Sequence, residues 1–135
     1  MNMKCLVASV AGAVVLFVGG YVLYELVLGG FMEANMGSAT GVMKESPSFL
    51  WIAVGQLASG GVLATVLGWA GATDAAGGAK AGAKVGALIA IAFGFVMLGT
   101  MNISTLTWTV VDVVVTAVLW GAAGAAVGIM LGRGD

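Results

Sequence analysis

Charged residues are so sparse in this sequence that they divide it into long uncharged stretches. Only 8% of the 135 residues are charged, whereas a typical soluble domain has about 25%. A helix needs about 20 mainly apolar residues, each rising 1.5 Å, to cross the hydrocarbon core of a bilayer. Four stretches satisfy this requirement, and the expected spans are residues 5–28, 48–70, 81–101 and 106–131. The sequence therefore predicts an all-α integral membrane protein: one domain over residues 1–135, with four transmembrane helices in an up-down antiparallel bundle.

The composition excludes several other classes of protein. With 61% hydrophobic residues the chain is far too apolar to be disordered. A single cysteine excludes a disulfide-stapled secreted module. Five basic residues and a net charge of −1 exclude a nucleic-acid-binding surface. Histidine is absent, so imidazole metal ligands and histidine-based catalysis are excluded as well. We therefore expect a non-enzymatic protein without a cofactor or metal.

The connections between the spans carry the turn-forming residues. Residues 32–47 hold the single proline, Pro47, just before the second span, where its missing N–H fits the first turn of a helix. Residues 71–80 are small, glycine-rich and polar, which predicts a loop. Residues 102–105 predict a tight turn. Short connections between successive helices favour antiparallel neighbours.

Basic residues predict the orientation of the chain. Lys4, Lys80, Lys84 and Arg133 lie on one side of the expected bundle, and Lys44 alone lies on the other. Cytoplasmic segments of membrane proteins carry the excess of Lys and Arg. We therefore expect a multi-pass protein of the inner (plasma) membrane with both termini in the cytoplasm and residues 32–47 outside.

Glycine is the second unusual feature, at 23 of 135 residues against about 7% in average proteins. Small residues allow helices in lipid to approach closely. They recur every four residues along the third and fourth spans, most clearly at Gly82, Gly86, Gly94, Gly124 and Gly128. The spacing predicts tight helix contacts at these glycines, either within the chain or between two copies. Leu16, away from these stripes, is expected to face lipid.

Several polar side chains are expected at one depth near the outer boundary. Glu25 and Asp112 each lie about 30 Å from the basic residue at the inner end of their span, at 1.5 Å per residue. Carboxylates inside a span are costly and are candidate functional groups by default. The candidate polar pocket, which would bind a proton or a cation, consists of Asp112, Asn102, Glu25, Gln56 and Tyr21.

A structural interpretation of the same residues stays open. Tyr24, Trp51 and Trp108 fit an aromatic belt at the membrane interface. Glu25 would then simply reach water. Asp112 would make a hydrogen bond across helices or cap the adjacent turn. If Asp112 points into the bundle, its expected hydrogen-bond partner is Asn102 or a tyrosine.

Five short segments resemble a known family. They are residues 19–24 (GGYVLY), 37–43 (GSATGVM), 82–86 (GAKVG), 100–102 (TMN) and 111–113 (VDV). Together they resemble small uncharacterised bacterial membrane proteins with four spans, the DUF1761-like family, a domain of unknown function. The resemblance implies a four-helix membrane fold and no established activity. The tyrosines, Asn102 and Asp112 fall at positions similar to the family pattern, whereas Glu25 stands where a small or apolar residue is expected.

Two functions are consistent with these features. The first is a packing or accessory subunit or scaffold, whose partners are the lipid bilayer and either further copies of the chain or a larger membrane complex. It is favoured by the small-residue stripes and by the lack of catalytic groups. The second is an oligomeric pathway for protons, cations or small molecules, favoured by the polar residues near the outer boundary. A lipid- or pigment-binding groove is a third, less favoured interpretation.

Overall fold

The computed structural model describes residues 2–133, which are predominantly helical and contain no strand beyond an isolated bridge between Met36 and Ser104. The elements in chain order are α1 (Met3–Gly20), η1 (Tyr21–Val27), α2 (Gly29–Ala34), α3 (Phe49–Ala70), α4 (Ala75–Thr100) and α5 (Leu106–Leu131). Within the described residues, four helical segments are long and apolar enough to cross a membrane: α1 with η1, α3, α4 and α5. The predicted all-helical class with four candidate spans is confirmed.

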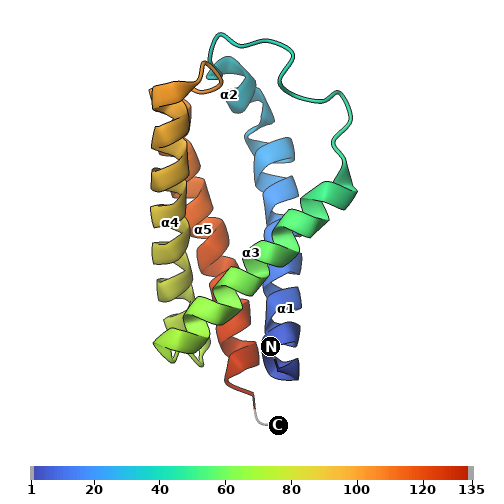
Figure 1. The fold of residues 1–135 in the computed structure, drawn as a ribbon, viewed down its shortest axis with the longest axis vertical. Coiled ribbons are helices and arrows are strands. Elements are labelled where there is room, and N and C mark those ends of the chain that lie inside the picture. The colour runs from blue at the N-terminus through green and yellow to red at the C-terminus, as the bar shows by residue number, and fades with distance from the viewer. Residues whose placement is uncertain (1, 134–135) are drawn as a thin grey trace.

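Three of the long helices lie side by side and the fourth crosses them. In Figure 1, α4, α5 and α1 stand nearly upright, and α3 runs obliquely across their front. The most extensive contacts are those of α4 with α5 and of α1 with α3. Both chain ends and the α3–α4 turn lie at one end of the molecule, here called the terminal end. Segment α2 and the loop over residues 35–48 lie at the other, the loop end.

Glycine allows α3 to cross α1 at close range. A β-carbon at Gly60 would collide with the backbone carbonyl oxygen of Ser9 and would lie 2.9 Å from the backbone nitrogen of Ala13. On the facing helix, a β-carbon at Gly12 would lie 3.5 Å from the Cα atom of Gly60. The two backbones therefore touch at a point where neither helix has a side chain, and this contact permits the oblique crossing.

The α3–α4 connection is shorter than the sequence predicts. The prediction of a loop over residues 71–80 is wrong for residues 75–80, because α4 already begins at Ala75. Asp74 caps this helix: its Oδ1 atom accepts the backbone N–H of Gly77 at 2.7 Å. The low helix propensity of glycine is overridden here by tertiary contact, since Gly78 packs directly on the backbone of Gly124 in α5.

The first span is not a uniform α-helix. Residues Tyr21–Val27 form a π-helix, in which the N–H of Leu28 bonds to the carbonyl oxygen of Leu23 at 2.8 Å. The segment lies between two glycine pairs, Gly19-Gly20 and Gly29-Gly30. A π turn takes in an extra residue and so changes the direction of the side chains that follow it. Segments of this kind occur frequently at functional sites.

The hydrophobic core occupies the terminal half of the molecule. Its largest fully buried side chains are Leu63 and Leu67 of α3 and Val127 of α5. Leu16 of α1 is only 2% exposed and belongs to the same cluster. The expectation that Leu16 faces lipid is therefore wrong: Leu16 follows Gly12 by one helical turn and so lies on the side of α1 that packs against α3 and α5.

Candidate functional site

A hydrogen bond between two spans is the centre of the polar region. The Tyr24 hydroxyl on η1 donates to Oδ1 of Asp112 on α5 at 2.6 Å. The same hydroxyl lies 3.2 Å from the Thr116 hydroxyl, one turn further along α5. All three side chains are partly buried. The carboxylate therefore has a hydrogen-bond donor inside the protein, as a polar group removed from water requires.

Aromatic packing fixes the position of Tyr24. The ring of Trp108 meets the ring of Tyr24 edge to face, with centroids 6.0 Å apart and planes at 69°. Trp108 is buried and also contacts Phe31 of α2, at 6.3 Å between centroids. Edge-to-face pairs at this separation are favourable arrangements for aromatic rings. The predicted interfacial belt residue Trp108 is therefore an internal packing residue, whereas Trp51 is 67% exposed.

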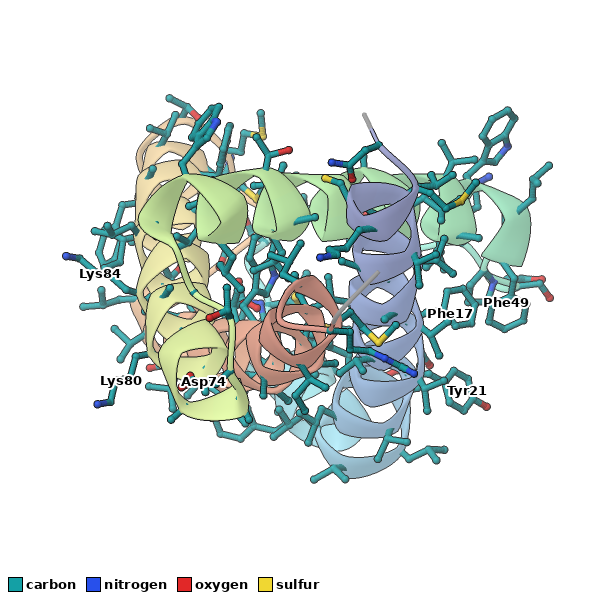
Figure 2. All side chains as sticks on the ribbon, turned by 90° about the horizontal axis from the view of Figure 1, so that it is seen from below. Phe17, Tyr21, Phe49, Asp74, Lys80 and Lys84 are labelled. Carbon is teal, nitrogen blue, oxygen red and sulfur yellow. The ribbon has the colours of Figure 1, made fainter. Side chains whose placement is uncertain are left out.

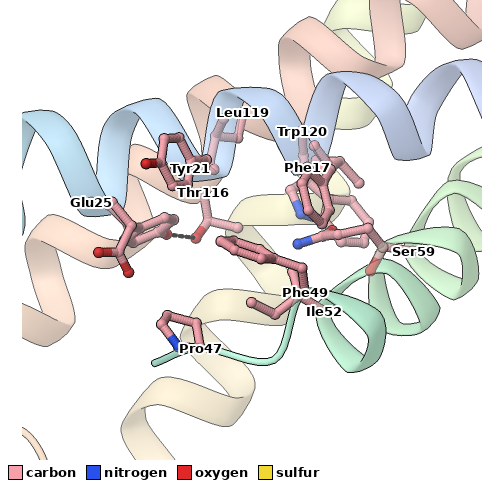
Figure 3. Close-up of a pocket in the computed structure, with 14 residues that line it drawn as sticks. Phe17, Tyr21, Glu25, Pro47, Phe49, Ile52, Ser59, Thr116, Leu119 and Trp120 are labelled. Carbon is pink, nitrogen blue, oxygen red and sulfur yellow. Dashed lines mark hydrogen bonds between the residues drawn. The ribbon is translucent and has the colours of Figure 1, made fainter. Parts of the chain in front are cut away.

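The first of two cavities beside this hydrogen bond is here called the α3-side cavity. It has a volume of about 330 Å³ and lies between η1, α1, α3 and α5. Tyr24 and Thr116 form part of its wall, together with Glu25, Gln56 and Ser59. Figure 3 shows Glu25 and Pro47 at one end of this cavity and Ser59 at the other, with Phe17 and Phe49 between them.

The second cavity lies on the other side of the hydrogen bond and is here called the α4-side cavity. It has a volume of about 280 Å³ and lies between α4, α5 and the turn that joins them. Asp112 lines this cavity, and Thr116 and Trp120 line both cavities. The contact of Tyr24 with Asp112 and Thr116 therefore stands between the two cavities.

The residues of the predicted polar pocket do not all come together. Tyr21, Glu25 and Gln56 line the α3-side cavity, and Asp112 lines the α4-side cavity. Asn102 lines neither of them. It is exposed in the α4–α5 turn, where its backbone carbonyl accepts the N–H of Ala39 at 2.8 Å.

The sequence predicts Tyr24 in the aromatic belt and Tyr21 in the polar pocket. In the structure Tyr21 packs on Phe49 of α3, with ring centroids 6.3 Å apart, whereas Tyr24 faces α5. The π turn separates these two tyrosines onto different sides of the span. The flanking glycine pairs are the only signal in the sequence for that turn, and they do not fix its register.

The predicted packing glycines lie mostly between α4 and α5. β-carbons at Gly82 and Gly86 would collide with Trp120, the first with its backbone carbonyl and the second with its side chain. β-carbons at Gly124 and Gly128 would collide with the backbone of α4 or of the residue just before it. Gly94 is less restricted, since its β-carbon would lie 3.3 Å from Cγ2 of Thr109. These contacts are all made within one chain.

The described residues form no metal centre, and no homologue indicates a reaction or a ligand. The described residues contain no group of three or more His, Cys, Asp or Glu side chains that could hold a metal ion. No protein-family model, curated protein or solved structure matches this chain. The resemblance to the DUF1761-like family therefore stays a prediction.

Proposed function

We propose that this chain is a non-enzymatic integral membrane protein that acts as a small packing or accessory subunit of a larger membrane assembly. The observation that carries the proposal is the closed core in the terminal half of the molecule. Leu63, Leu67 and Val127 are fully buried there, and Leu119 and Leu16 cover them on the side of the cavities. A pathway through one chain would have to cross this apolar cluster, where charge transfer is costly.

Buried polar side chains at both ends of the molecule support the same proposal because they form hydrogen bonds within the chain. The Ser9 hydroxyl donates to the backbone carbonyl of Cys5 at 2.8 Å. Thr109 donates to the carbonyl of Thr105 at 2.8 Å and lies 3.0 Å from the Ser104 hydroxyl. Groups that satisfy each other in this way stabilise a fixed body. The apolar outer faces of the helices then remain available to contact lipid or another subunit.

The proposal includes a location and an orientation. The four spans would cross a bacterial inner membrane in alternating directions, with both termini in the cytoplasm. Lys80 and Lys84 project outward from α4 in Figure 2, which views the terminal end. The long side chains of exposed lysines can extend to the cytoplasmic interface from within the first turns of a helix.

Cysteine labelling tests this orientation. Ser38 is exposed in the loop at the loop end of the molecule. In a Cys5→Ser background, Ser38→Cys will react with a membrane-impermeant maleimide added to intact spheroplasts. Arg133→Cys, at the terminal end, will react only after lysis. Labelling of Arg133→Cys in intact spheroplasts, with labelling of Ser38→Cys only after lysis, would show that the orientation is the reverse.

Native purification tests the accessory role. Extracted from its own host in a mild detergent, the chain will migrate in an assembly well above its own mass of 13.4 kDa. Asp112→Asn should keep the same partners, because the amide can still accept the hydrogen bond from Tyr24. A wild-type chain that is folded but monomeric under these conditions would contradict the proposal.

A second candidate function is an oligomeric proton or cation pathway. It is favoured by one observation, the position of the Tyr24–Asp112 hydrogen bond between two cavities. In that case further copies of the chain would supply the polar route that the core of one chain lacks. Flux through reconstituted liposomes separates the two functions, because only the pathway requires the ionisable group of Asp112.

A further inference from the structure

The α3-side cavity combines aromatic walls with a carboxylate at its rim. The ring of Phe17 lies 6.1 Å from that of Phe49, and Phe49 in turn lies 6.3 Å from Tyr21. Trp120 closes the cavity on the side of α5. Aromatic faces that surround a cavity attract organic cations through their quadrupoles, most strongly for quaternary ammonium groups.

Glu25 supplies the negative charge at this rim. Its side chain is exposed and lies at the end of the cavity nearest the loop (Figure 3). Within residues 2–133 its carboxylate has neither a hydrogen bond nor an ion pair. Lys44 lines the same shallow groove as Glu25, beside Pro47, and no ion pair joins the two among residues 2–133. The carboxylate is therefore free to meet a ligand.

Beyond the aromatic rings the cavity wall is mostly apolar and extends toward the core. Leu16, Ile52 and Leu119 line it beyond the aromatic rings, and Gln56 and Ser59 add neutral polar atoms. Its volume of about 330 Å³ is at the small end of the usual range for ligand pockets, about 300–1,000 Å³. A ligand that fits these walls has a positive head and a short hydrocarbon tail.

We propose that the α3-side cavity binds an amphiphilic ammonium cation, with the head between Glu25 and the rings of Tyr21 and Phe49 and the tail toward Leu119. Such a group is carried both by free alkylammonium compounds and by lipids with a choline or ethanolamine headgroup. The inference does not rest on the accessory role, because binding is measured on the isolated chain without partners.

Octyltrimethylammonium is a suitable probe, since it is soluble and has the required head and tail. Its control is a soluble neutral near-isostere, octyldimethylphosphine oxide, which has the same tail and a head of similar size without a net charge. Titrated into the chain in a neutral maltoside detergent and followed by calorimetry, the cation should bind about tenfold or more tightly than the isostere, since only the cation gains cation–π and Coulomb energy. Equal binding of the two compounds would reduce the site to an apolar groove and overturn the proposal.

Three variants assign the interaction to its residues. Glu25→Gln should weaken cation binding about tenfold, and Phe49→Leu should weaken it about fivefold, while both leave the isostere unaffected. Glu33→Gln, an equal change of charge on exposed α2 outside the cavity, should change nothing. An unchanged affinity in Glu25→Gln, with the wild-type melting temperature, would overturn the proposal.

Competition distinguishes the two sources of the cation. Short-chain phosphatidylcholine that displaces the probe, when phosphatidylglycerol of the same length does not, would assign the site to a lipid headgroup. If neither lipid displaces the probe, the site would be assigned to a free amphiphile. Displacement by both lipids equally would show that the positive head is not recognised, and would contradict the proposal.

Discussion

The α4–α5 contact gives the sharpest prediction about stability, through the substitution Gly124→Ala. A β-carbon at Gly124 would collide with the backbone carbonyl of Gly78 and would lie 3.0 Å from the Cα atom of Gly82. Both obstacles are backbone atoms, so the added methyl group can be accommodated only if the two helices move apart. Separation loses dispersion contacts along the whole stripe, since these hold helices together in lipid. Overpacking of this kind costs about 1–3 kcal/mol.

The matched control is Gly55→Ala on α3. A β-carbon at Gly55 meets nothing within 4 Å, and alanine has a helix propensity up to about 1 kcal/mol better than glycine. Gly124→Ala should therefore be less stable than wild type by about 2 kcal/mol, and Gly55→Ala should be equal or more stable. Unfolding by SDS titration in mixed micelles, followed by circular dichroism, measures both. If the two variants unfold at the same SDS fraction, α4 and α5 do not pack through their glycines.

Three further substitutions test other contacts by the same assay. Tyr24→Phe removes the hydroxyl that donates to Asp112 and should cost about 1 kcal/mol; no loss would mean that this bond does not hold η1 to α5. Leu63→Ala removes a fully buried side chain and should cost about 2 kcal/mol or more, whereas Val14→Ala, at a side chain 56% exposed, should cost much less. Asp74→Ala removes the cap of α4 and should cost about 1 kcal/mol; an unchanged helix content and stability would favour the later start of α4 at residue 81.

The existence of the four apolar helices was predictable because charge and hydropathy act over about 20 residues at a time. The start of α4 was not, since its first residues are glycine, alanine and lysine, which locally favour a loop. Helix formation there depends on the contact of Gly78 with Gly124, which are far apart in sequence. Local composition cannot report such a contact.

The candidate site was predictable in part. Depth along a span follows from residue number, and three side chains that the sequence places at one depth, Tyr21, Glu25 and Gln56, line the same cavity. The side that each one faces depends on the helix type and on crossing angles. The π turn brings Tyr24 to Asp112 and turns Tyr21 toward Phe49. The sequence does not fix the register of that turn, so it does not fix the direction of either tyrosine. The burial of Leu16 does have a signal, since Leu16 follows Gly12 by one helical turn on the face that packs inside the bundle.

We propose that this chain is a structural membrane subunit whose closed core prevents conduction. Proton flux into liposomes that contain the purified chain, followed with an internal pH-sensitive dye under an imposed potential, tests it most directly. We expect the same slow leak for protein-free liposomes, for the wild type and for Asp112→Asn. A wild-type flux well above that leak, abolished by Asp112→Asn while the variant stays folded, would contradict the claim and establish the pathway.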